Sequence, residues 1–170
     1  PRVFSGTFTK LSSYTSGASY SSSMVGDAEL LVGATGITTR IRVDGGRSDT
    51  EFKAHLHAAP CSSDGGGHYQ NPNNVGNVNA VDENWPELTC DGSGNCEGAA
   101  TNTWVPTGYS LASGLSIVIH DTPGSGSKML CADLVAPRVF SGSFTKLSSY
   151  TAGSAYSSLM VGDAELLVGA

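Results

Sequence analysis

The chain contains only four histidines, and their spacing is the clearest chemical signal in the sequence. His55 and His57 are two residues apart in EFKAHLH, so on a β-strand both imidazoles would leave the same face. His120 ends the alternating stretch LSIVIHD, and His68 lies in the glycine-rich stretch GGGHYQNP. Converging imidazoles suit copper or zinc. Because any single histidine is more often a surface or hydrogen-bonding residue, the predicted metal site depends on the four together.

Alternating apolar and polar residues predict the strands that would position these histidines. In EFKAHLH, Phe52, Ala54 and Leu56 share one face, and the two histidines share the opposite face, where a loop could cover them. Further strands are expected at 3–11, 28–32, 37–43, 101–105, 115–120 and 128–134. About eight strands, glycine-rich turns and no helical pattern predict an antiparallel β-sandwich or barrel. Residues 61–98 are expected to form a long irregular loop of functional importance.

The cysteines bear on stability and on the compartment. An even count in a chain rich in glycine and serine favours two disulfides and an oxidising, extracellular environment. Three pairings are possible for Cys61, Cys90, Cys96 and Cys131. Cys90 and Cys96 are close in TCDGSGNC, which favours a local bridge between them and would leave Cys61 with Cys131.

Composition limits the partners. Only 14% of the residues are charged, the net charge is −6, and acidic and basic residues are interspersed. This pattern argues against a nucleic acid as partner. No apolar run approaches the length of a membrane span.

The first 34 residues occur twice. Residues 137–170 repeat Pro1–Ala34 with differences only at positions 7, 16, 18, 19 and 23 of the first copy. We therefore expect one complete domain at 1–136, followed at 137–170 by the first strands of the next tandem repeat. The junction LVAPRV leaves almost no linker, so neighbouring repeats could be partners in a filament. One hypothesis is that Val139–Leu147 adds as a strand to the preceding domain.

Four stretches together resemble the copper/zinc superoxide dismutases: HLHAAPC, GGHYQNP, SIVIHD and SKMLCADL. The resemblance covers about residues 37–134, in the same order. It implies an eight-stranded Greek-key β-barrel and a disulfide between Cys61 and Cys131. It also implies three copper ligands and the histidine that bridges copper and zinc, which are His55, His57 and His120, and His68, respectively.

Two departures from that family point to a copper-only subgroup. No histidine lies between His68 and His120, so no zinc site is expected. Only DTPGSGSKML separates His120 from Cys131, where the family has a long electrostatic loop. Both losses resemble the copper-only superoxide dismutases of fungi and the related tandem-repeat proteins.

Two further positions follow from the resemblance. In the fungal copper-only enzymes an acidic residue after the second cysteine of a pair supports a copper histidine, and Glu97 matches it; the alternative is a solvated loop carboxylate. Lys128 stands where the family has its active-site arginine. A lysine keeps the positive charge that attracts superoxide but lacks the planar fork of donors. The alternative is an ordinary lysine at a strand end.

Two functions are therefore expected. In the first, each repeat is an extracellular copper-only superoxide dismutase, in which Lys128 steers superoxide and His68 carries a proton when copper is reduced. In the second, each repeat is a structural bead of an extracellular fibre or coat, and copper is vestigial, stabilising or stored. Whether the protein is an enzyme stays open on the sequence.

Overall fold

The computed structural model describes residues 1–15, 23–122, 126–136, 138–143 and 163–168. The chain divides into two compact units, Pro1–Ala136 and Pro137–Ala170. This division falls where the second copy of the repeated segment begins. The first unit contains all four histidines.

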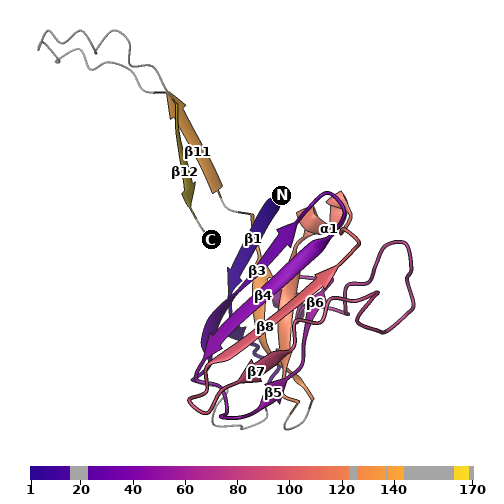
Figure 1. Cartoon of the computed structure of the whole chain (residues 1–170), viewed down its shortest axis with the longest axis vertical. Coiled ribbons are helices and arrows are strands. Elements are labelled where there is room, and N and C mark those ends of the chain that lie inside the picture. The colour runs from indigo at the N-terminus through magenta and orange to yellow at the C-terminus, as the bar shows by residue number, and fades with distance from the viewer. Residues whose placement is uncertain (16–22, 123–125, 137, 144–162, 169–170) are drawn as a thin grey trace, which may run out of the picture. The chain divides into compact units, whose positions relative to one another are not determined.

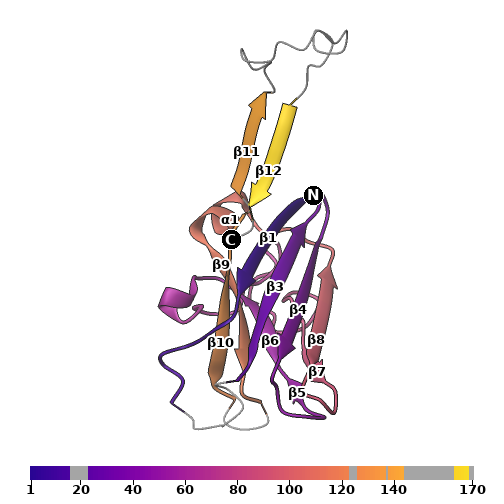
Figure 2. The ribbon, with the colours of Figure 1, turned by 90° about the vertical axis from the view of Figure 1, so that its left-hand side faces the viewer.

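The first unit is built from two antiparallel sheets (Figures 1 and 2). One sheet has six strands, in the order β1 (Arg2–Thr7), β3 (Val25–Val32), β4 (Ile37–Asp44), β8 (Cys96–Asn102), β7 (Leu88–Cys90) and β5 (Glu51–Phe52). The other has four, in the order β2 (Thr9–Lys10), β10 (Lys128–Leu134), β9 (Leu115–His120) and β6 (Ala54–His57). The predicted all-β, antiparallel sandwich is confirmed.

The core lies between the sheets and follows the alternation of the sequence. On β4, Ile37, Thr39, Ile41 and Val43 are buried, and the alternate residues are half-buried or exposed. Phe52 and Leu56 are fully buried, as their alternation with the histidines predicts. The strand β9 is buried on both faces except at its last residue, so a second layer must cover its outer side.

The N-terminal segment joins the two sheets. β1 pairs with β3 in the six-stranded sheet, and its continuation β2 pairs with β10 in the other sheet. Ser5 on β1 also pairs with Val135, which follows β10. The amide of each donates to the carbonyl oxygen of the other at 3.0 Å. Gly6 makes this approach possible, since a Cβ there would fall on the backbone carbonyl of Asp133.

Several elements differ from the predictions. β8 occupies Cys96–Asn102, whereas a strand was expected at 101–105, because the small residues of CEGAATN carry little hydrophobic alternation. β7 and the 3-10 turn Cys61–Ser63 lie within the expected irregular loop. A short helix, α1 (Gly108–Ser113), is capped by Thr107, whose side chain accepts a hydrogen bond from the Ser110 amide. Six residues are too few to give a helical pattern in the sequence.

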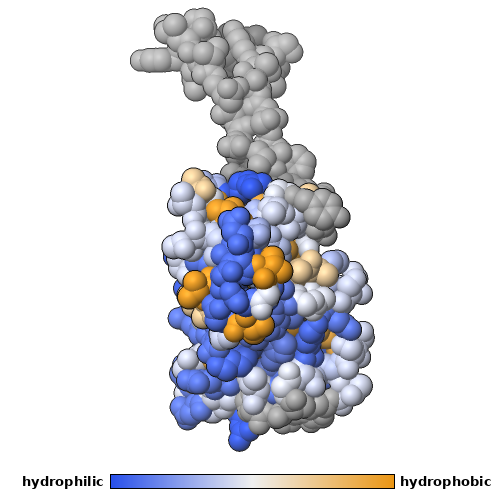
Figure 3. Space-filling view, turned by 90° about the vertical axis from the view of Figure 1, so that its right-hand side faces the viewer, coloured by the Kyte–Doolittle hydropathy of each residue, from blue (hydrophilic) through white to orange (hydrophobic). Residues whose placement is uncertain are grey.

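Part of the predicted loop does project from the sheets on the side of β6 (Figure 1). Its three valines, Val75, Val78 and Val81, are 75%, 69% and 73% exposed. Figure 3 views the molecule from this side and shows separate apolar spots within a largely hydrophilic surface. No helix in the described part of the chain is long and apolar enough to cross a membrane.

The second unit contains a two-stranded antiparallel hairpin, β11 (Arg138–Ser143) with β12 (Asp163–Val168). Its register, Arg138 opposite Val168, repeats that of Arg2 opposite Val32 in the first unit. The described part of the predicted strand Val139–Leu147 thus pairs within its own repeat. Residues 144–147 lie outside the described residues.

Candidate metal centre

The four histidines meet at one place. Each offers one ring nitrogen, and these four atoms all lie within 4.8 Å of one another. The ring centroids of His55 and His68 are 4.0 Å apart, and those of His55 and His120 are 4.9 Å apart. This is the only group of three or more potential metal ligands found among the described residues.

Strand register positions three of these side chains. β6 and β9 are neighbours in the four-stranded sheet, with His55 opposite Val118 and His57 opposite Ser116. His120 is the last residue of β9, on the same outer face of the sheet. Because side chains two residues apart on a strand share a face, the sheet alone brings these three imidazoles together.

The loop that follows β6 brings the fourth. His57 and His68 form an isolated antiparallel bridge, and the amide of Tyr69 donates to the carbonyl oxygen of Leu56 at 2.8 Å. Between these points the chain folds over His57. Gly65 has φ +71°, and a Cβ there would lie 2.7 Å from a methyl group of Val118. The glycine-rich sequence is therefore what lets the loop cover β6 and β9 so closely.

Hydrogen bonds fix which ring nitrogens face the centre. The Nδ1 atoms of His57 and His120 lie 3.1 Å and 3.2 Å from the carbonyl oxygens of Gly66 and Gly126, to which a protonated Nδ1 donates. The Nε2 atoms of both residues, and Nδ1 of His55, are buried without any hydrogen-bond partner. Buried polar atoms are normally paired, so three unpaired nitrogens at one point fit a bound metal ion. Their donor type fits copper or zinc.

Glu83 orients the fourth histidine. Its carboxylate is 1% exposed at the side-chain level and accepts a hydrogen bond from His68 Nδ1 at 2.7 Å. The same carboxylate accepts from Gln70 Nε2 at 3.1 Å and from Trp85 Nε1 at 2.8 Å. With Nδ1 engaged, His68 has Nε2 left as its ligand atom. Carboxylates that hold a ligand imidazole in this way set its tautomer and orientation.

The assignment of Glu97 to this role was wrong. Glu97 lies on β8 in the six-stranded sheet, its side chain is 74% exposed, and it faces Arg42 at 3.4 Å. Glu97 is therefore a solvent-exposed carboxylate, which was the alternative considered from the sequence. Glu83 escaped sequence reasoning because its approach to His68 depends on two segments of irregular loop. Leu56 on β6 holds both of them, by accepting from Tyr69 and donating to the carbonyl oxygen of Asn84.

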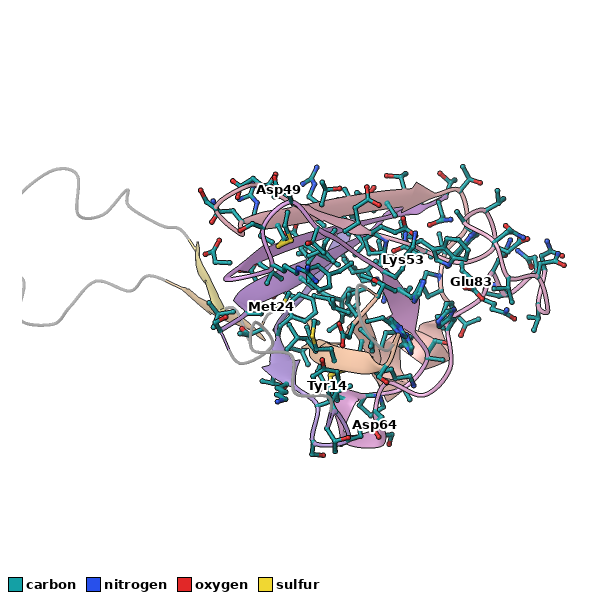
Figure 4. The ribbon with its side chains drawn as sticks, turned by 90° about the horizontal axis from the view of Figure 1, so that it is seen from below. Tyr14, Met24, Asp49, Lys53, Asp64 and Glu83 are labelled. Carbon is teal, nitrogen blue, oxygen red and sulfur yellow. A yellow bond between two sulfur atoms is a disulfide. The ribbon has the colours of Figure 1, made fainter. Side chains whose placement is uncertain are left out.

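Lys128 lies beside the cluster. It is opposite His120 in the β10–β9 register. Its ammonium donates to the carbonyl oxygens of Asp64 and Gly66. Asp64, on this loop, and Glu83, the partner of His68, are labelled in Figure 4. The lysine therefore clamps the loop that covers His57 and at the same time brings a positive charge to the edge of the site.

Burial keeps the strand histidines neutral. Burial is the largest cause that lowers the pKa of His55 and of His57 to about 3, and it also lowers the pKa of His120. Burial alone would raise the pKa of Glu83, but hydrogen bonds from Gln70, Trp85 and His68 outweigh it and leave the pKa lowered. At neutral pH the site thus presents uncharged imidazoles with free lone pairs and one ionised carboxylate.

One of the two disulfides holds the covering loop. Cys61–Cys131 ties the start of the covering loop to β10, with a Cα–Cα distance of 5.7 Å. The backbone amide of Cys61 also donates to the Asp133 carboxylate at 2.7 Å. Cys90–Cys96 joins β7 to β8 in the six-stranded sheet, with a Cα–Cα distance of 3.9 Å.

The fold and the cluster together define a superoxide dismutase-like β-sandwich with a four-histidine site that is compatible with copper. No protein-family model matches the sequence, and no curated protein matches it. Among solved structures, the crystal structure of a mutant of a SOD-like protein from Bacillus subtilis is similar, with a TM-score of 0.50. The two sequences are 17% identical, and the match covers 78% of this chain and 99% of that chain. At this identity the likeness shows the fold alone.

Proposed function

We propose that the first unit binds one copper ion through His55, His57, His68 and His120 and disproportionates superoxide. The observation that carries the proposal is the convergence of three buried, unpartnered ring nitrogens on one point, with His68 Nε2 beside them. The free energy of leaving such groups unpaired is recovered when a metal ion binds them.

The chemistry that bound copper supplies is a one-electron exchange, which oxidises one superoxide to oxygen and reduces the next to peroxide. The chain contributes the rest. Lys128 provides the positive charge that attracts the anion, although its donors are shared with the carbonyl oxygens of Asp64 and Gly66. His68 could hold a proton on Nε2 while its Nδ1 stays hydrogen-bonded to Glu83, so the ring would keep one orientation with Nε2 protonated or free to act as a ligand.

Copper alone is proposed as the metal. In the family that the sequence resembles, a second metal fixes the bridging histidine. Here Glu83 makes the equivalent bond to His68 Nδ1, in the middle of a hydrogen-bond network with Gln70 and Trp85. A carboxylate in this position supports a site that needs no zinc.

The setting of the domain is also a proposal. We place it in an extracellular tandem array, with residues 1–136 as one repeat and residues 137–170 as the start of the next. The two disulfides favour an oxidising compartment. The identical register of the two hairpins supports the view that the second copy begins another domain of the same fold.

In the alternative function the domain is a structural bead, and copper stabilises it or is stored in it. This alternative rests on the near-identity of residues 1–34 and 137–170. A regular filament requires the same junction again and again, and a catalyst does not. Lys128 as an anchor of the covering loop, rather than as a superoxide guide, is compatible with this role.

Copper loading followed by two measurements tests the proposal. We expect an electron paramagnetic resonance spectrum with nitrogen splitting and a copper-dependent acceleration of superoxide decay. Lys128→Met should slow that decay and reduce its dependence on ionic strength, because it removes the charge that steers the anion. A tight copper site without turnover would leave the storage or structural function. Absence of a nitrogen-split signal after loading would exclude the histidine site.

A further inference from the structure

A buried tyrosine–aspartate pair lies next to the histidine cluster and has no part in the chemistry proposed above. The hydroxyl of Tyr14 donates to the carboxylate of Asp121 at 2.7 Å, and the two residues are 4% and 1% exposed. Asp121 directly follows His120 in the chain. Because burying a carboxylate costs free energy unless hydrogen bonds compensate it, the pair marks a polar contact that is held beside a candidate ligand.

Tyr14 belongs to the N-terminal segment, which reaches this place along β10. After the pairing of β2 with β10, the amide of Leu11 donates to the carbonyl oxygen of Met129 at 3.0 Å. The amide of Tyr14 then donates to the carbonyl oxygen of Leu11 at 3.1 Å, and the ammonium of Lys10 lies 5.3 Å from the centroid of the tyrosine ring. The ring is therefore held at its backbone and on its face, and its hydroxyl has a defined position.

Asp121 closes the turn that follows β9. Its amide donates to the carbonyl oxygen of Ser127 at 2.8 Å, and its carbonyl oxygen accepts from the amide of Gly126 at 2.6 Å. The carbonyl oxygen of Gly126 lies 3.2 Å from Nδ1 of His120, whose Nε2 is one of the unpartnered nitrogens of the cluster. A series of contacts thus runs from the Tyr14 hydroxyl through Asp121 and Gly126 to the His120 ring.

The covering loop, which orients His57 in the same manner, is held by other means. The Cys61–Cys131 disulfide and the ammonium of Lys128 both fasten it. The neighbour of Tyr14, Ser13, adds a hydrogen bond at 2.9 Å to the carboxylate of Asp64 on this loop. The loss of the Tyr14 hydroxyl would therefore act on His120 and leave the supports of His57 in place.

We propose that Tyr14 is a positioning residue for His120. By holding Asp121, it keeps the Gly126 carbonyl oxygen beside Nδ1 of His120, so the proton stays on Nδ1 and Nε2 remains free as a ligand atom. The hydrogen bond made by one ring nitrogen decides in this way which nitrogen can bind a metal. The consequence for copper rests on the proposed function, whereas the position of the proton is a property of the metal-free chain.

Nuclear magnetic resonance of the copper-free full chain tests the proposal. At neutral pH, long-range proton–nitrogen correlation spectra give, for each histidine, the ratio of the Nδ1–H to the Nε2–H tautomer. Tyr14→Phe removes the hydroxyl and leaves the ring. Thr9→Val is the matched control, because it removes a hydroxyl of the same segment that bonds the carbonyl oxygen of Cys131 at 3.4 Å. His57 is the internal reference in every spectrum.

We expect Tyr14→Phe to shift the tautomer ratio of His120 towards Nε2–H by about 5-fold, which corresponds to the loss of one hydrogen bond. The ratio of His57 should stay unchanged, and Thr9→Val should alter neither histidine. An unchanged His120 ratio in Tyr14→Phe overturns the proposal. Equal shifts of both histidines overturn it as well, because the hydroxyl would then stabilise the fold in general and not position one ring.

A second variant tests the route through the aspartate. Asp121→Ala alone should shift the His120 ratio in the same direction, by at least as much as Tyr14→Phe. Adding Tyr14→Phe to Asp121→Ala should then have no further effect, since residues that act through one bond are not additive. If Tyr14→Phe shifted the ratio equally with and without Asp121, the hydroxyl would act by another route and the proposal would be wrong.

Copper binding provides the functional measurement. Competition with a chelator of known affinity should show that Tyr14→Phe weakens copper binding by about 10-fold, whereas Thr9→Val binds like the unmodified chain. An unchanged affinity in a chain with a shifted tautomer ratio would overturn the positioning role. If the unmodified chain took up no copper, the proposed function would fail, and the tautomer ratios would still decide whether Tyr14 positions His120.

Discussion

The candidate metal centre combines two regions that are positioned in different ways. His55, His57 and His120 stand on β6 and β9, where the register of the sheet fixes them. His68 stands on a loop and is held by a hydrogen bond to Glu83, with the backbone bridge to His57 behind it. The Nδ1 atoms of His57 and His120 lie beside backbone carbonyl oxygens, whereas Nδ1 of the loop histidine is hydrogen-bonded to a buried carboxylate.

The difference suggests a division of roles. A sheet that sets three neutral imidazoles side by side could hold a metal ion without large movement, because its geometry is set by backbone hydrogen bonds and by the core beneath. A loop imidazole whose Nδ1 is held by Glu83 could exchange a proton for a metal at Nε2 without turning its ring. The four predictions below test this division, beginning with the largest expected effect.

Removing a strand histidine should abolish the copper site, and removing the loop histidine should only weaken it. We expect His57→Gln to lower copper affinity by more than about 100-fold, which exceeds the loss typical of an outer hydrogen-bond partner. His68→Gln should retain copper with one nitrogen fewer in the electron paramagnetic resonance spectrum. Competition with a chelator of known affinity gives both values. Equal losses for the two variants would contradict the division.

The two disulfides should contribute unequally to stability. Cys61 and Cys131 are separated by 70 residues, and Cys90 and Cys96 by 6. The loop-closure argument then predicts a loss of about 4 kcal/mol for the Cys61→Ser/Cys131→Ser variant and about 2 kcal/mol for Cys90→Ser/Cys96→Ser. Urea unfolding of the copper-free protein measures both.

The same two variants also show how much the covering loop contributes to copper binding. Only the loss of Cys61–Cys131 frees the start of the covering loop, so only that variant should also weaken copper binding. If the Cys90–Cys96 variant weakened copper binding as much, the effect would come from general destabilisation and not from the loop.

Glu83 and Glu97 form a matched pair for the loop histidine. Glu83→Gln removes the charge that holds His68 Nδ1, and we expect copper affinity to fall by about 10- to 100-fold. Glu97→Gln changes an exposed carboxylate on the other sheet and should leave copper affinity unchanged. A larger effect from Glu97→Gln than from Glu83→Gln would return the supporting role to the residue that the resemblance indicated.

Acid should destabilise the copper-free protein through the strand histidines. His55 and His57 have a pKa of about 3 when folded and close to 6.5 when unfolded, so the unfolded state binds more protons below pH 6.5. Their contribution is therefore constant above pH 6.5 and is lost as the pH falls from 6.5 towards 3. Unfolding midpoints measured across this range should show a shallower slope in His55→Gln. An unchanged slope would mean that these imidazoles accept protons in the folded state.

Periodicity was sufficient for most of the strands and for the faces of the strand histidines. The alternation in EFKAHLH predicted that Phe52 and Leu56 enter the core while His55 and His57 leave on the other side, and the structure agrees. Local patterns work here because a strand's two faces are determined by neighbouring residues in the chain.

Contacts between irregular segments could not be predicted in the same way. Glu83 and His68 approach each other because both flanking segments hydrogen-bond to Leu56, and no spacing in the sequence encodes that arrangement. The resemblance gave the wrong carboxylate, Glu97, since its position after a cysteine was matched without knowing which sheet it occupied. Because CEGAATN shows only weak alternation, the strand was expected at 101–105 and not at Cys96–Asn102, where β8 lies.

The bridge between Ser5 and Val135 has a mechanical consequence. Because β1 runs antiparallel to the end of β10, the chain enters and leaves the first unit at the same end of the sandwich (Figure 1). Tension applied through Pro1 and Ala136 would therefore peel the N-terminal strand away one hydrogen bond at a time, rather than shear all its bonds together. The first unit under load would extend at low force by opening this N-terminal strand, while the Cys61–Cys131 disulfide and the four-histidine cluster behind it stayed intact.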